Sequence, residues 1–171
     1  MPQVILTGFM ATGKTEVGRR LARRLGRPFV DTDGLVEAAA GKRVAAIFAE
    51  EGEAHFRALE RAAVAEACLV PEAVVATGGG TLLDADSRRR LAAAGPIVCL
   101  SASAEEIVRR VEDAGTRPLL ANGGGGDRLG RIRELLATRA AVYALATHEV
   151  DTSGLSVDEV VERVRALVAG R

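Results

Sequence analysis

The strongest constraint on this chain is the octapeptide GFMATGKT, which spans Gly8 to Thr15. It matches the pattern G-x-x-x-x-G-K-[ST] and lies between a hydrophobic, strand-like run at 3–7 and an amphipathic helical pattern at 14–25. Glycines let such a turn aim its backbone N–H groups at phosphate oxygens, and the helix N-terminus adds unpaired donors. A chance glycine-rich turn would rarely meet four specified positions in this setting. We therefore expect a phosphate-binding loop, with Lys14 reaching the β- and γ-phosphates of a nucleotide and the Thr15 hydroxyl binding Mg²⁺.

Length and composition favour one globular domain. The 171 residues are enough for one core and few for two. Lys and Arg together number 23, as do Asp and Glu, so no net positive field attracts nucleic acid or an anionic membrane. Neither an apolar run of about 18 residues nor a signal sequence is visible, so we expect a cytoplasmic protein. Cys68 and Cys99 are isolated, which argues against a zinc site or a disulfide framework.

Short β-like runs alternate with longer helical patterns, which predicts an α/β fold with a largely parallel sheet. The strand candidates are 3–7, 27–33, 73–80, 96–101 and 148–153. Helices are expected over 14–25, in short pieces over 35–51, and over 53–69, 84–94, 104–113, 129–143 and 156–169. The segment GTRPLLANGGGGD at 115–127 lies between the helices expected over 104–113 and 129–143. It is rich in glycine, which predicts a mobile excursion.

Two acidic residues, Asp31 and Asp33, lie where the second strand candidate runs into an acidic turn, in the sequence VDTDG. Strand alternation would place both side chains on one side at the carboxyl end of the sheet, where ligands bind in open α/β folds. One carboxylate would support Mg²⁺ through water, and the other would meet an acceptor hydroxyl. A helix N-cap is an equally good role for Asp33.

A second group of residues suits an acidic acceptor. Arg57 and Glu60 are three apart on a helix and can pair, usually on the surface. Arg139 follows Ile132 by one heptad on an apolar stripe, where a charge needs a partner or a cavity. The TGGG run at 77–80 would let a ligand lie against bare backbone, or is simply a tight turn.

Together these motifs resemble the shikimate kinase family. The matching segments are GFMATGKT at 8–15, DTD at 31–33, FRALE at 56–60, TGGG at 77–80, RPLL at 117–120 and RAAVY at 139–143. They follow the family's order across essentially the whole chain. The resemblance implies an α/β, three-layer P-loop kinase fold, with a five-stranded parallel sheet, helices on both faces and a mobile lid. It also implies a single domain over 1–171, an acceptor-binding region at about 32–60 and a lid at about 112–127.

The implied activity is ATP-dependent phosphorylation of the 3-hydroxyl of shikimate, a step toward chorismate and the aromatic amino acids. ATP is the co-substrate and Mg²⁺ the cofactor. Residue by residue, the resemblance assigns catalysis to Asp33, Lys14 and Arg117; ATP binding to Ala11, Thr12, Gly13, Lys14, Thr15, Glu16 and Arg117; shikimate binding to Asp33, Arg57, Gly78, Gly79, Gly80 and Arg139; and the metal to Thr15 and Asp31.

The chain departs from the family at Ala11, where many members have Gly, and at Glu16, where a hydroxyl residue is common. The segment 153–155 should approach the adenine. We expect a monomer whose partners are shikimate and ATP, with no nucleic acid or membrane. Two alternatives remain: a related kinase, acting on gluconate or a nucleoside monophosphate, and a nucleotide switch or inactive binding module that keeps only the phosphate loop.

Overall fold

Five parallel strands form the central sheet of the computed structural model, which describes residues 1–114 and 127–169. Their order is β2-β3-β1-β4-β5. The strands are β1 (Val4–Gly8), β2 (Phe29–Asp31), β3 (Val74–Ala76), β4 (Ile97–Ser101) and β5 (His148–Asp151). The predicted parallel sheet is confirmed. The expected excursion at 115–127, with Arg117, lies outside the described residues except for its last position.

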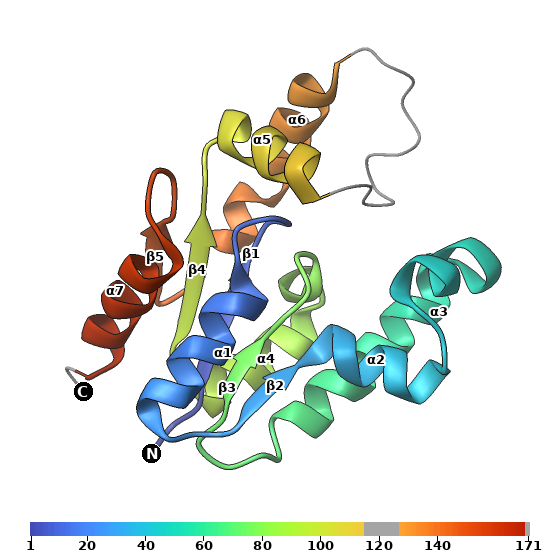
Figure 1. The fold of residues 1–171 in the computed structure, drawn as a ribbon. Coiled ribbons are helices and arrows are strands. Elements are labelled where there is room, and N and C mark those ends of the chain that lie inside the picture. The colour runs from blue at the N-terminus through green and yellow to red at the C-terminus, as the bar shows by residue number, and fades with distance from the viewer. Residues whose placement is uncertain (115–126, 170–171) are drawn as a thin grey trace.

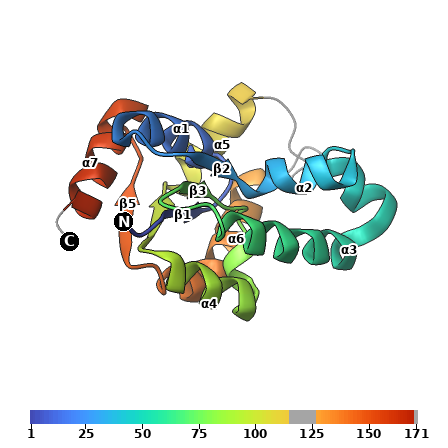
Figure 2. The ribbon, with the colours of Figure 1, turned by 90° about the horizontal axis from the view of Figure 1, so that it is seen from below.

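Helices cover both faces of this sheet, as Figures 1 and 2 show. One face packs against α1 and α7 through a core that includes Leu21 and Val164. The other packs against α3 and α4 through Val64 and Leu91. The helices are α1 (Lys14–Leu25), α2 (Thr32–Ala40), α3 (Val44–Ala67), α4 (Ala85–Ala94), α5 (Ala104–Ala114), α6 (Arg128–Tyr143) and α7 (Val157–Ala169), with a short 3-10 turn at Thr81–Leu83. The three-layer fold is thereby confirmed. Among the described residues, no helix has the length and apolarity needed to cross a bilayer.

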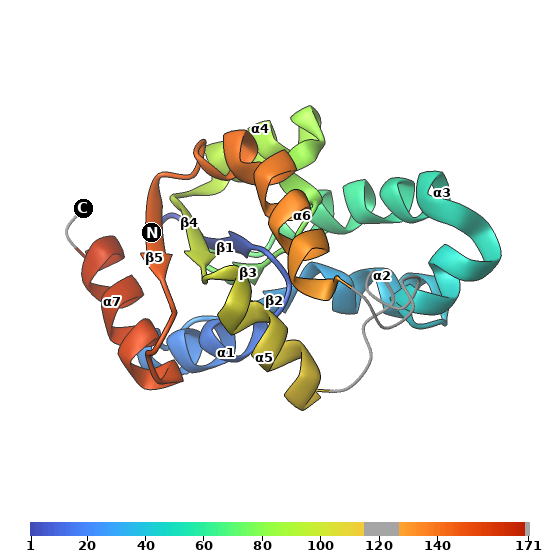
Figure 3. The same ribbon diagram turned by 90° about the horizontal axis from the view of Figure 1, so that it is seen from above.

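Parallel pairing brings the carboxyl ends of all five strands to one edge of the sheet. The central strand β1 pairs Leu6 with Ala76 of β3 and Gly8 with Leu100 of β4. Seen from above in Figure 3, the segments that leave this edge are surrounded by α2, α5 and α6. The phosphate loop, the Asp31 region and the TGGG run therefore meet at the same end of the molecule.

Two strand boundaries differ from the prediction at this edge. Thr32 and Asp33 belong to α2 and not to the second strand, because the Asp31 side chain caps that helix by accepting from the Asp33 N–H at 3.0 Å. The third strand ends at Ala76, so TGGG at 77–80 forms the connection that follows it.

An arm made of α2 and the first part of α3 projects beside the β2 edge of the sheet (Figure 1). It has a small apolar core of its own, built on Val36, Ile47 and Phe56. The predicted break between helical pieces is confirmed as a kink at Gly52, whose φ of 85° and ψ of 172° are not helical. The prediction extended the second piece to Leu69, but the helix ends at Ala67 and the Leu69 side chain is exposed.

Gly52→Ala should lower the free energy of unfolding by about 1–3 kcal/mol, because this positive φ suits only glycine. A Cβ at Gly52 meets no atom within 4 Å, so the cost would come from the backbone alone. The control is Gly34→Ala in α2, where φ is not positive and a Cβ would make only ordinary contact; there a gain of up to about 1 kcal/mol is expected. Urea denaturation of both variants measures the contrast, and equal effects at the two sites would contradict it.

Candidate functional site

The phosphate loop folds around the carbonyl of Phe9. Thr12 Oγ1 and Lys14 Nζ both donate to this oxygen, at 2.8 and 2.9 Å. Gly13, in the left-handed region at φ 88°, leads into α1 without a side-chain cap. The first N–H groups of α1 therefore have no capping side chain, which is the arrangement that binds phosphate oxygens at helix N-termini.

Ala11 adopts a left-handed backbone conformation, with φ 59°. A non-glycine residue there costs on the order of 1 kcal/mol or more, which explains why glycine is common at this position in the family that the sequence resembles. The Ala11 carbonyl accepts from Arg110 Nη1 at 3.0 Å, so α5 helps to hold the strained loop. Glu16, the other departure, pairs with Arg20 on the exposed side of α1, at 2.8 Å. Its side chain is therefore engaged away from the loop.

Thr15 and Asp31 lie together at the start of α1 and the end of β2. Thr15 Oγ1 donates to Asp31 Oδ2 at 2.9 Å, while the other oxygen of Asp31 caps α2. Hydroxyl and carboxylate oxygens are the donors that Mg²⁺ prefers. Across the described residues, no three His, Cys, Asp or Glu side chains gather as a metal site. Any Mg²⁺ at this pair would therefore take most of its ligands from phosphate and water.

Asp33 carries a strongly perturbed carboxylate. Burial, followed by the neighbouring charges of Asp31 and Glu60, raises its pKa from 3.8 to about 6, against the opposing effect of Lys14. The capping role that the sequence left open for Asp33 belongs to Asp31. The proximity of the two carboxylates was predicted, but it arises from the start of α2 and not from strand alternation.

Glu60 is buried and Arg57 is partly buried, so this is not the surface ion pair that such spacing usually indicates. Arg57 Nη1 donates to Glu60 Oε2 at 2.7 Å, and the Glu60 side chain is 3% exposed. Its other oxygen accepts from Thr81 Oγ1 at 2.6 Å, just after TGGG. Glu60 thus orients Arg57 toward the glycine run. The sequence carried a signal for this, since Glu60 shares the helical stripe of Phe56 and Ala63.

The glycine triplet lies against both predicted arginines. A Cβ at Gly80 would lie 2.7 Å from Arg57 Nη2, and one at Gly79 would lie 3.2 Å from Arg139 Nη1. At Gly78 a Cβ would approach the Asp33 Oδ1 to 3.2 Å. Because residues 78–80 lack a Cβ, these three charged groups can approach their backbone this closely. The structure therefore brings Asp33, Arg57 and Arg139 together beside the phosphate loop.

Arg139 also contacts the phosphate loop directly. Its guanidinium carbon lies 5.2 Å from the centroid of the Phe9 ring, within the range of a cation–π interaction. The prediction that Arg139 faces inward with the apolar stripe of α6 is confirmed, since Ile132 is fully buried and Arg139 is partly so.

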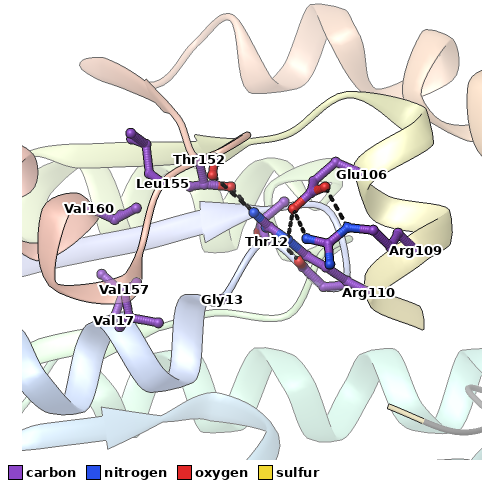
Figure 4. A pocket seen from close by; sticks show the side chains of 11 residues that line it. Thr12, Gly13, Val17, Glu106, Arg109, Arg110, Thr152, Leu155, Val157 and Val160 are labelled. Carbon is purple, nitrogen blue, oxygen red and sulfur yellow. Dashed lines mark hydrogen bonds and ion pairs between the residues drawn. The ribbon is translucent and has the colours of Figure 1, made fainter. Parts of the chain in front are cut away.

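A cavity of about 230 Å³ opens between the phosphate loop, α5 and the segment that runs from the end of β5 into α7 (Figure 4). Arg110 donates to both Oγ1 and the carbonyl of Thr152, at 3.0 and 2.9 Å, and pairs with Glu106 at 2.9 Å. Arg110 was not predicted as a site residue, because its partners are distant in the sequence. The lining residues are Ala11, Thr12, Gly13, Val17, Glu106, Arg109, Arg110, Thr152, Leu155, Val157 and Val160.

Comparisons with known proteins decide the family. A family model described as shikimate kinase matches residues 10–169. A shikimate kinase of Pelotomaculum thermopropionicum is 44% identical over 164 residues, which are 96% of this chain and 94% of the relative. The chain belongs to the shikimate kinase family. It is therefore an enzyme, a kinase that phosphorylates shikimate with ATP.

Solved structures agree with the shikimate kinase assignment. A shikimate kinase from Acinetobacter baumannii in complex with shikimate superposes with a TM-score of 0.90 at 32% identity, covering 99% of this chain and 93% of that one. A gluconokinase from Sinorhizobium meliloti reaches a TM-score of 0.63 at 20% identity, covering 98% and 91%. At that identity the gluconokinase shares the fold alone.

Asp33→Asn should stabilise this shikimate kinase near neutral pH. The raised pKa of Asp33 means that its ionisation costs more free energy in the folded protein than in the unfolded chain. The folded state binds the proton more tightly than the unfolded chain, so stability falls as pH rises from about 4 through the folded pKa of about 6. At pH 7.5 the variant should gain about 1–3 kcal/mol over the unaltered chain. Below pH 4 the gain should vanish.

Urea denaturation of both proteins across pH 4 to 8 measures this difference. A gain that does not change with pH would show that the Asp33 charge is not the cause.

Proposed function

We propose that this shikimate kinase transfers the γ-phosphoryl group of ATP to the 3-hydroxyl of shikimate at the edge where β1, β2 and β3 end. The observation that carries the proposal is the convergence of Asp33, Arg57 and Arg139 on the bare backbone of 78–80, beside the phosphate loop. Two guanidinium groups suit one carboxylate, and a neighbouring carboxylate suits a hydroxyl. Such a site fits a small hydroxylated acid.

On the nucleotide side, the backbone of 11–16 and the Lys14 ammonium would hold the phosphates of ATP. Lys14 already lies over the loop, where its ammonium donates to the Phe9 carbonyl. Mg²⁺ would be held by Thr15 directly and by Asp31 through water, and would neutralise phosphate charge when bound. Their mutual hydrogen bond of 2.9 Å places both oxygens on one side of the loop.

On the acceptor side, Arg57 and Arg139 would bind the shikimate carboxylate, while Asp33 orients the reacting hydroxyl. With a pKa of about 6, Asp33 is mostly ionised at neutral pH and accepts a hydrogen bond. It is also basic enough to take the hydroxyl proton late in the transfer. Because phosphoryl transfer passes through a loose transition state, this positioning is most of what the protein must supply.

The cavity between α5 and the segment after β5 is where the nucleoside of ATP would lie. Leu155 and Val157 offer an apolar side, and Arg110 offers a planar cation beside the loop. This agrees with the expectation that 153–155 approaches the adenine.

We further propose the division of the single domain that the resemblance implies, with an acceptor region at about 32–60 and a lid at about 112–127 that carries Arg117. We propose, too, that the enzyme is a monomer, as the sequence analysis expects. We also propose that the enzyme acts in the cytoplasm.

ATP turnover with and without shikimate tests the reaction. ADP should form when shikimate is present, and neither gluconate nor a nucleoside monophosphate should replace it. Asp33→Ala should abolish most of this turnover yet leave ATP affinity nearly unchanged, since the contacts proposed for ATP lie elsewhere. Near-normal kcat in that variant would refute the role of Asp33.

Arg139→Ala should weaken shikimate binding by about 1.5–3 kcal/mol, the value of a charge-assisted pair. The matched control is Arg133→Ala on the same helix, where an exposed arginine pairs with Glu105 of α5 at 2.5 Å. Calorimetric titration with shikimate measures both variants. Arg133→Ala should leave the affinity unchanged, and equal losses would argue against a carboxylate site at Arg139.

A further inference from the structure

Tyr143 is the single tyrosine of the chain, and its hydroxyl reaches the glycine triplet. It donates to the carbonyl of Gly79 at 2.6 Å, across 64 residues of sequence. Tyr143 also follows Arg139 by one helical turn, so both side chains leave α6 on the same face. The hydroxyl therefore ties α6 to the segment that lies against both acceptor arginines.

Gly79 itself lies at the junction of the two substrate regions. A Cβ placed there would lie 3.2 Å from Arg139 Nη1 and 3.3 Å from the Gly8 carbonyl oxygen. The next atom along the phosphate loop, the Met10 nitrogen, would lie at 3.7 Å. A rotation of the Gly79 peptide would change the spacing between Arg139 and the loop.

The ring and the hydroxyl of Tyr143 have separate tasks. The ring packs against the apolar cluster of Phe9, Ile107 and Ile132, a task that phenylalanine performs equally well. The hydroxyl is a polar group in a partly buried place, and its partner there is the Gly79 carbonyl. Burial raises the pKa of Tyr143, and the nearby Arg139 opposes this, so the hydroxyl stays protonated and able to donate at neutral pH.

We propose that Tyr143 is a positioning residue, whose hydroxyl holds the Gly79 peptide and the Arg139 guanidinium in one arrangement, so that the acceptor carboxylate binds at a set distance from the phosphate loop. The inference rests on the proposed role of Arg139 and the glycine triplet. Tyr143 acts through these groups and need not touch the reacting atoms.

Tyr143→Phe tests the hydroxyl alone, because it keeps the ring. The KM for shikimate should rise about three- to tenfold, the loss of one hydrogen bond, with the KM for ATP changing by less than about twofold. The kcat should change little, since saturating shikimate compensates for weaker binding. An unchanged KM for shikimate would overturn the proposal.

Val142→Ala controls for a merely structural effect. Val142 precedes Tyr143 and packs against the apolar core on the far side of the sheet from α1. This variant should lower the unfolding temperature at least as much as Tyr143→Phe while leaving the KM for shikimate unchanged. If Val142→Ala raised that KM equally, Tyr143 would be only a packing residue and the proposal would be wrong.

Tyrosine fluorescence gives a direct signature, because the chain has one tyrosine and no tryptophan. Shikimate alone should change the emission of Tyr143 saturably, with a midpoint equal to its calorimetric dissociation constant, and Arg139→Ala should reduce this response. If saturating shikimate left the fluorescence emission of Tyr143 unchanged, the proposal would be contradicted. If Arg139→Ala leaves the shikimate affinity unchanged, both the proposed carboxylate site and the positioning role of Tyr143 are wrong. If Arg139→Ala weakens binding but Tyr143→Phe has no effect, only the positioning role is wrong.

Discussion

The contact between Gly8 and β4 is the constraint on which both halves of the active site depend. A Cβ at Gly8 would lie 2.1 Å from the Leu100 carbonyl, and its φ of 137° is itself a glycine conformation. Only glycine therefore lets β1 pair with β4 to its last residue and then turn at once into the phosphate loop. The Phe9 carbonyl that follows holds Lys14, and the Phe9 ring faces Arg139. In the proposed mechanism, one turn therefore serves both the nucleotide and the acceptor.

Buried charge is concentrated next to this turn, around the glycine triplet at 78–80. Asp33 is held near Asp31 and Glu60 in a place that raises its pKa, which costs stability at neutral pH. The pair of buried Glu60 and partly buried Arg57 need not stabilise the fold, since desolvation offsets much of the attraction. Its consequence is geometric: Arg57 keeps one orientation beside the glycine triplet. The site thus exchanges some stability for fixed charges at the place where we propose that an acid and a hydroxyl bind.

Most of the fold could be predicted from local patterns, and the errors have local causes. The five strands, the helices and the kink near residue 52 follow from hydrophobic periodicity and glycine placement. Asp33 was assigned to a strand because alternation was extended past Asp31, whose side chain in fact begins a helix. Glu60 was interpreted as a surface partner because its spacing from Arg57 says nothing of its exposure. Arg110 was missed because its partners are the Ala11 carbonyl and Thr152, 99 and 42 residues away.

By itself the sequence determined the phosphate loop, because a turn between a strand and a helix depends on neighbouring residues alone, and it supplied the residue types that we propose for the acceptor. Only the tertiary structure decided which charges are buried, which of them meet and what holds them. The burial of Glu60, the raised pKa of Asp33 and the bond from Tyr143 to Gly79 arise between segments far apart in the chain. Desolvation and pairing are properties of a packed neighbourhood, and that neighbourhood exists only after the parallel strands bring their carboxyl ends to one edge.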